Sequence, residues 1–238
     1  MRLRARIGYT SVAYVTEIFP KVFYGMVPEG VLLQMLTQQV TSHEARNMER
    51  IHDEARAAAK SFARAGADLV ILGGAPTNLS RGRAALDEVL AALGEEIGIP
   101  VSCSASAQSN ALAAVGAKKV GVVHPSNPRR DASHDQQLRD DGLEPMGNRS
   151  AGATFEDYNR IPDDVAYGLG RELKEAVPEI DSLLYSCPHW AVTHAIEPLE
   201  RDLGVSVITS LQAIAWEGLR KCGIEDRIDG YGKLLSQH

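Results

Sequence analysis

The chain has 238 residues, of which 44% are hydrophobic and 24% are charged. This length accommodates one large α/β domain or two smaller lobes, and the composition is that of a globular protein rather than a disordered one. The formal net charge of −6 argues against a surface for nucleic acids or anionic membranes.

The three cysteines, Cys103, Cys187 and Cys222, are an odd number at wide spacing. This pattern fits neither a disulfide framework nor a zinc site, and it indicates a reducing, cytoplasmic location. No apolar run reaches the roughly 18 residues of a membrane span, and no signal peptide is evident. We therefore predict a cytoplasmic protein with no membrane, nucleic-acid or metal partner.

The first half of the chain alternates apolar runs of strand length with amphipathic runs of helical length. We predict strands over 6–12, 31–40, 68–72 and 98–106, and helices over 42–65, 84–97 and 107–115. The intervening residues 13–30 contain two prolines and two glycines and show no clear pattern.

The second half follows the same alternation. We predict strands over 116–126, 183–187 and 204–210, and helices over 129–141, 163–176, 191–202 and 211–221. Residues 144–159 form a variable stretch, and the last ten residues are irregular or a short helix. The pocket walls are expected to come from residues 10–36 and from the 150s, where the pattern is weakest.

A faint internal repeat connects the two halves. A helix leads into GADLVILGGAP at 66–76, and later a helix leads into IDSLLYSCPH at 180–189. A strand–helix order that occurs twice predicts two similar flavodoxin-like α/β lobes, each with a parallel sheet flanked by helices. We expect lobe 1 to comprise 1–115 and 211–238, lobe 2 to comprise 116–210, and the active site to lie in the cleft between them.

Cys187 is the first candidate for chemistry. The apolar run 183–185 ends on Ser186 and Cys187, and a helical pattern begins just beyond. Ligands of parallel α/β sheets bind at the carboxyl ends of the strands. A thiol that faces a helix N-terminus is favoured as thiolate. The alternative is a small buried residue that closes a strand, since free cysteine is often part of the core.

The loop after the strand at 68–72 is the second candidate. Gly73 and Gly74 let the backbone approach a ligand closely, and a following helix offers amides to an anion. A plain strand-to-helix turn is the alternative, because two adjacent glycines are a weak signal. Pseudo-twofold packing of the lobes would place loops 73–78 and 186–190 across one cleft.

Six stretches, in this order, carry a resemblance to a known family: PEGV with VT (28–31, 40–41), GADLVILGG with RG (66–82), GIPVSCSAS (98–106), LLYSC (183–187), EPLERDLGVSVITS (197–210) and DGYGKLL (229–235). Over nearly its whole length the chain resembles the aspartate/glutamate racemase superfamily. Within it, the sequence is most similar to the branch of arylmalonate decarboxylases and maleate cis-trans isomerases.

The resemblance implies a role for Cys187. Racemases of the superfamily place two cysteines on opposite sides of the substrate, whereas arylmalonate decarboxylases have glycine at the first position and keep only the second cysteine. Cys187 matches the second cysteine, and the first position falls on Gly74, or on Ala75 after a one-residue slip. Cys103 and Cys222 are interpreted as structural, and the chemistry requires no cofactor.

The chain departs from the decarboxylase pattern at the substrate-binding positions. The hydroxyl residues that follow the glycine in that family are Ala75 and Pro76 here, and the second-lobe tyrosine aligns with Ser126. Pro188 replaces the glycine after the cysteine and has no amide proton to donate. The expected donors are therefore the main-chain amides near Gly74, Ala75 and His189, together with the side chains of Thr77, Asn78, Ser126 and Asn127.

His189 follows Cys187 by two residues, and Cys-Pro-His-Trp resembles the Cys-Thr-His-Tyr motif of glutamate racemases. The resemblance implies that His189 assists proton transfer by Cys187, at a pH near neutrality. A half-buried histidine at a helix start is the alternative. Trp190 is interpreted as core packing.

Three functions follow from these residues. The first is a cofactor-independent decarboxylase of a substituted malonate or similar small carboxylate, in which Cys187 protonates an enediolate. The second is a cis-trans isomerase or racemase of a small dicarboxylate or amino acid, in which Cys187 works with His189 or His124. The third is a binding or regulatory protein on the same scaffold. We favour the first function, because one thiol suits one protonation at carbon. The sequence leaves open whether the protein forms a homo-oligomer.

Overall fold

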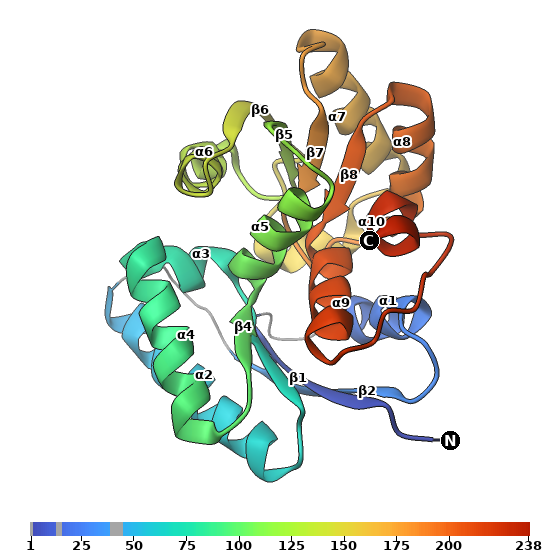
Figure 1. Cartoon of the computed structure of the whole chain (residues 1–238). Helices are drawn as coiled ribbons and strands as arrows, with labels where there is room; N and C mark the ends of the chain where they lie inside the picture. The colour runs from blue at the N-terminus through green and yellow to red at the C-terminus, as the bar shows by residue number, and fades with distance from the viewer. Residues whose placement is uncertain (1, 13–15, 39–44) are drawn as a thin grey trace.

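The computed structural model describes residues 2–12, 16–38 and 45–238, and its strands form two four-stranded sheets (Figure 1). The first has the order β2-β1-β3-β4, formed by β1 (Ala5–Ser11), β2 (Val31–Thr37), β3 (Leu69–Leu72) and β4 (Val101–Cys103). The second has the order β6-β5-β7-β8, formed by β5 (Lys119–His124), β6 (Glu144–Ser150), β7 (Ser182–Tyr185) and β8 (Ser206–Thr209). All neighbouring strands are parallel, so the predicted fold class is confirmed.

Helices flank both sheets. The first half contains α1 (Ile18–Met26), α2 (Ala45–Arg64), α3 (Ala75–Asn78), α4 (Arg83–Ile97) and α5 (Ser104–Ala114). The second half contains α6 (Asp131–Asp140), α7 (Asp163–Ala176), α8 (Ile196–Leu203), α9 (Ser210–Lys221) and α10 (Gly232–Gln237). Short 3-10 turns are η1 (Leu79–Arg81), η2 (Pro128–Arg130), η3 (Phe155–Arg160) and η4 (Thr193–Ala195).

The two halves share a continuous core. Helices α5 and α9 pack against each other, and one hydrophobic cluster contains Ile7 and Ile71 of the first sheet together with Val122 and Leu184 of the second. Burial of such side chains is the main stabilising contribution, about 1.5–3 kcal/mol for each. The relative placement of the two sheets is therefore held by packing. The lobe limits at residues 115 and 210 stay a prediction.

Two elements differ from the sequence prediction. Helix α1 was not predicted, because Pro20 lies within it; a proline is tolerated in the first turn of a helix, where its missing N–H has no partner to lose. Phe19 and Phe23 of α1 are fully buried. Strand β6 was not predicted either, because it lies at a sheet edge and its polar residues are half-buried.

Some predicted boundaries shift. Strand β2 ends at Thr37, and the predicted strand end and helix start within 39–44 lie outside the described residues. Strand β4 ends at Cys103 because α5 begins at Ser104, where the Cys103 sulfur accepts a hydrogen bond from the amide of Ser106. Helix α8 begins at Ile196 rather than at residue 191.

Candidate active site

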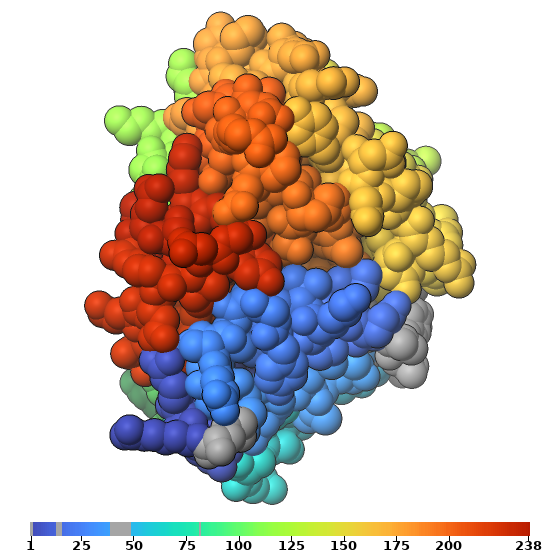
Figure 2. All heavy atoms as spheres, turned by 90° about the vertical axis from the view of Figure 1, so that its right-hand side faces the viewer, coloured from blue at the N-terminus to red at the C-terminus, as the bar shows by residue number. Residues whose placement is uncertain are grey.

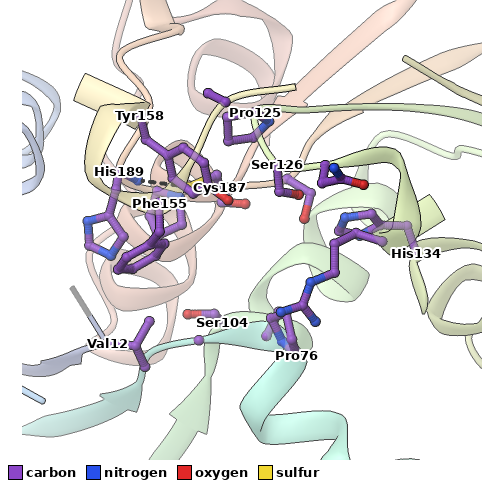
Figure 3. Close-up of a pocket in the computed structure, with 18 of the residues that line it drawn as sticks. Val12, Pro76, Ser104, Pro125, Ser126, His134, Phe155, Tyr158, Cys187 and His189 are labelled. Atoms are coloured by element: carbon purple, nitrogen blue, oxygen red, sulfur yellow. Dashed lines mark hydrogen bonds between the residues drawn. The ribbon is translucent and has the colours of Figure 1, made fainter. Parts of the chain in front are cut away.

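A cavity of about 520 Å³ lies between the two sheets, at the carboxyl ends of their strands. Its walls include Val12 and residues 74–77 from the first half, and residues 125–127, 153–156 and 186–189 from the second. The predicted loops therefore meet across one cavity (Figure 3).

The two halves also meet outside the cavity. The amide of Asn159 donates a 2.8 Å hydrogen bond to the carboxylate of Glu17. In Figure 2, the blue segment that contains α1 lies directly against the yellow and orange segments of the second half. This side of the molecule is therefore covered by contact between the two halves.

Gly74 determines the shape of the first loop. Its φ of +80° is in the region that favours glycine, and a Cβ at this position would lie 2.6 Å from Cγ1 of Val12. Both the backbone conformation and the close approach of Val12 disfavour a side chain at this position. Ala75 and Thr77 of α3 follow directly and line the cavity with Pro76.

Asn78 is not among the residues that line this cavity, so the structure does not bring it together with the other predicted binding residues. Residues 75–78 form the short helix α3, and the turn of a helix directs the side chain at position 78 away from the cavity. The Asn78 amide donates a hydrogen bond of 3.3 Å to the carbonyl of Gly73, and the side chain borders a separate hollow beside Leu72 and Leu86.

Cys187 lines the cavity two residues after the end of β7, and its side chain is half-buried. The main-chain amide of His189 donates a hydrogen bond of 3.4 Å to the sulfur. Burial raises the pKa of the thiol to about 12, and the amides of His189 and Trp190 oppose this rise only in part. The cysteine is therefore a thiol at neutral pH.

This protonation state corrects the prediction of a thiolate at a helix N-terminus. Residues 188–192 form no helix, and the helical segment starts only with η4 at Thr193. The favourable helix-end charges expected beside Cys187 are consequently not next to the sulfur, and desolvation decides the pKa.

His189 is buried, and both of its ring nitrogens have hydroxyl neighbours. Nε2 lies 3.4 Å from the hydroxyl of Ser11, and Nδ1 lies 3.2 Å from the hydroxyl of Thr16. Burial lowers the pKa of the imidazole to about 4, so the ring is neutral at pH 7. The expectation that it titrates near neutral pH is wrong, because the ring is desolvated and lacks a carboxylate partner among these contacts.

The loop after β5 brings Ser126 and Asn127 to the cavity, as predicted. The Asn127 side chain accepts a hydrogen bond of 3.0 Å from the amide of Arg129 and so caps η2. The hydroxyl of Ser126 lies 2.9 Å from Nδ1 of His124. Pro188 also lines the cavity.

Several cavity residues were not identified from the sequence pattern, among them Arg130, His134, Phe155 and Tyr158. Tyr158 lines the cavity together with Ser126, and burial raises the pKa of its hydroxyl to about 12. The wall was expected from the 150s, but neither periodicity nor spacing identified particular side chains there. Arg130 and His134 belong to a helical region whose charge pattern indicated an exposed helix.

The other two cysteines lie elsewhere. Cys103 is fully buried at the start of α5, and Cys222 is half-buried at the end of α9. Trp190 is also buried and packs against Tyr185, with ring centroids 6.0 Å apart. These positions agree with structural roles.

A two-lobed parallel α/β fold with a cysteine-bearing cavity between the lobes defines a class of cysteine-containing α/β enzymes. The chain belongs to the arylmalonate decarboxylase family, which matches residues 26–235. It is 31% identical to the arylmalonate decarboxylase of Bordetella bronchiseptica over 196 residues, which cover 80% of this chain and 78% of that protein.

Solved structures of this class share the fold. An unliganded arylmalonate decarboxylase superposes with a TM-score of 0.87 at 24% identity, covering 98% of this chain and 100% of that one. A maleate cis-trans isomerase mutant from Nocardia farcinica with a covalent succinylcysteine superposes with a TM-score of 0.86 at 18% identity, covering 98% and 99%. The fold is therefore common to decarboxylases and isomerases.

The described residues contain neither a membrane-spanning helix nor a cluster of metal ligands. None of the described helices combines the length and apolar character needed to cross a membrane. Within residues 2–12, 16–38 and 45–238, no group of three or more His, Cys, Asp or Glu side chains is arranged to hold a metal ion.

Proposed function

We propose that this protein is a cofactor-independent decarboxylase of a substituted malonate or a similar small carboxylate. The observation that carries the proposal is that Cys187 is the only cysteine among the described residues that line the cavity. The loop opposite begins at Gly74, where the φ angle and the close approach of Val12 disfavour a second thiol. One thiol supplies one proton to one face of a carbon.

The cavity has an apolar side and a polar side. Val12 and Phe155 lie on the side of His189, whereas Ser126 and His134 lie on the other, with Cys187 between them (Figure 3). A leaving carboxylate on the apolar side is poorly solvated, which favours its loss as CO2. The retained carboxylate would lie among the hydroxyl groups of Thr77, Ser126 and Tyr158 and the guanidinium of Arg130.

In the proposed decarboxylation, one proton replaces the departing CO2 on the α-carbon. The bond between the α-carbon and the leaving carboxylate breaks, CO2 departs, and the electron pair remains as an enediolate. Cys187 transfers its Sγ proton to the α-carbon, and the resulting thiolate regains a proton from solvent. The high pKa of Cys187 keeps the donor protonated before each turnover. His189 contributes its main-chain amide to the sulfur, and its neutral ring forms part of the wall.

The proposal is tested in D2O with a panel of 2-substituted malonates, followed by NMR and CO2 release. We expect CO2 loss with one deuterium placed on carbon, and a fall in kcat of about 10²-fold or more in Cys187→Ala, the range typical of a general acid. Cys222→Ala is the matched control, because that thiol lies at the end of α9, and it should retain activity.

Three outcomes contradict the proposal. Deuterium exchange or cis-trans conversion without CO2 would assign the protein to the isomerases or racemases. Ligand binding without turnover by the parent protein would support a binding function. Full activity in Cys187→Ala would exclude the cysteine as the acid.

A further inference from the structure

A second chemically competent group lies in the same cavity. The Ser126 hydroxyl is 2.9 Å from Nδ1 of His124, and Nε2 of the same ring is 2.8 Å from a carboxylate oxygen of Asp131. A carboxylate only accepts hydrogen bonds, so Nε2 carries the ring proton and Nδ1 accepts from the serine. The order serine, histidine, aspartate is the one that activates a serine for nucleophilic attack.

The backbone holds this array in place. His124 is the last residue of β5 and is fully buried, and Asp131 is the first residue of α6. A negatively charged side chain in the first turn of a helix interacts favourably with the helix dipole. The carbonyl of Ser126 accepts a hydrogen bond from the hydroxyl of Ser150. The three side chains are thus positioned by a strand end, a helix start and a fixed loop.

A second buried imidazole lies beside His124. The ring of His134 lies 4.8 Å away between centroids and is buried. Burial lowers the pKa of His134 to about 3, so this neighbour is neutral. It adds no positive charge against the proton that His124 would take from Ser126, and the Asp131 carboxylate stabilises that proton.

We propose that Ser126 is a nucleophile and that the protein cleaves small esters through an acyl-Ser126 intermediate. The serine oxygen bonds to the carbonyl carbon, and its proton passes to Nδ1 of His124. The ester C–O bond then breaks, and the alcohol leaves with that proton. Water attacks the acyl group by the same route, which releases the acid and regenerates the serine.

The cavity also supplies partners for the developing oxyanion and the substrate. Tyr158 lines the same cavity as Ser126, and we assign its hydroxyl as the donor to the carbonyl oxygen attacked at the serine. Arg130 lines the same cavity and favours esters that also carry a carboxylate. The 520 Å³ of the cavity limits the substrate to a small molecule. This activity does not use Cys187 and is independent of decarboxylation.

The test is labelling with a small alkyl fluorophosphonate, read by intact mass and peptide mapping. It is performed on Cys187→Ala, which removes the competing thiol. We expect one phosphonyl group on Ser126, none at that position in Ser126→Ala, and a labelling rate at least about tenfold lower in Asp131→Asn. Ser133→Ala is the matched control: its exposed hydroxyl on α6 binds the carbonyl of Arg130, and the rate should be unchanged.

The proposal also predicts a burst of p-nitrophenol from p-nitrophenyl acetate in Cys187→Ala, and its loss in Ser126→Ala. An adduct on Ser104 or Ser186 instead, or no adduct, would overturn it. So would equal labelling rates in the parent and in Asp131→Asn, once a melting curve has shown that the variant is folded. His124→Asn gives a second, independent arm of the same comparison.

Discussion

The main-chain amide of His189 donates a hydrogen bond to the sulfur of Cys187 across 3.4 Å, so the histidine acts on the cysteine through its backbone. The imidazole is directed instead toward the hydroxyls of Ser11 and Thr16. Because burial raises the pKa of the thiol, this pair holds a proton donor rather than a thiolate nucleophile.

The first prediction follows from that thiol. Alkylation by iodoacetamide proceeds through thiolate, and the Cys187 pKa of about 12 leaves little thiolate at pH 8. We expect Cys187 to react on the order of 10²–10³ times more slowly than an unperturbed cysteine, with a rate that still rises above pH 9. Peptide mapping in the Cys222→Ala variant measures this rate without interference. Rapid alkylation with an inflection near pH 7 would show that the sulfur is a thiolate.

The second prediction concerns stability in acid. The folded pKa of His189 is about 4 and that of an unfolded histidine is 6.5. Between these values the unfolded chain binds more protons, so stability is fully present above pH 6.5 and falls as the pH decreases toward 4. The expected slope is about 1.4 kcal/mol per pH unit for this histidine. Urea unfolding of His189→Gln should show a shallower decline over this window, and an identical slope would contradict the assignment.

The third prediction concerns the stability cost of a side chain at Gly74. An alanine here must adopt φ +80° and place its Cβ 2.6 Å from Val12. Gly98 has φ +73° with nothing within 4 Å of the added Cβ, so Gly98→Ala isolates the backbone cost, about 1–2 kcal/mol. Gly74→Ala should cost at least about 1 kcal/mol more because of the overpacking. Equal losses of unfolding free energy in the two variants would remove Val12 as the reason for glycine.

The fourth prediction concerns an ion pair between the halves. Arg83 at the start of α4 pairs with Asp141 after α6, and the two side chains are only 19% and 10% exposed. Ser109 also donates to Asp141. Arg83→Ala leaves a buried carboxylate without its cation and should cost about 3–5 kcal/mol. Arg56, whose side chain is 62% exposed, forms an ion pair with Glu96. Arg56→Ala should therefore lower the free energy of unfolding by less than about 1 kcal/mol. Denaturant curves of both variants make the comparison.

The fifth prediction tests Tyr158 in the proposed decarboxylation. Tyr158 lines the cavity together with Ser126, so Tyr158→Phe removes a hydroxyl donor from the site and keeps the ring. If the hydroxyl contacts the retained carboxylate, where charge develops in the enediolate, kcat should fall by about 10-fold or more with a smaller change in KM. A change in KM alone would limit Tyr158 to ground-state binding. Tyr167→Phe is the control. Tyr167 lies on α7, and its hydroxyl donates a hydrogen bond to Asp202, so this variant should leave both kcat and KM unchanged.

The sequence by itself determined the parallel α/β lobes, most helices and strands, and the two loops that meet at the cavity. Local periodicity and the glycines of loop 73–74 carry that information, because strand and helix patterns depend on neighbouring residues. Cys187 was identified in the same way, from its place just after the β7 apolar run. Helix α1 and strand β6 were not predicted, because a helix with a proline in its first turn and a polar edge strand lack those patterns.

Only the tertiary structure decided the chemical state of the site. Ser11 and Thr16 contact His189 from the other end of the chain, and desolvation by distant segments determines the pKa values of His189 and Cys187. The direction of Asn78 depended on a four-residue helix, and the Ser126–His124–Asp131 array on how a strand end meets a helix start. Burial and side-chain direction are properties of the packed chain, so a linear pattern does not contain them.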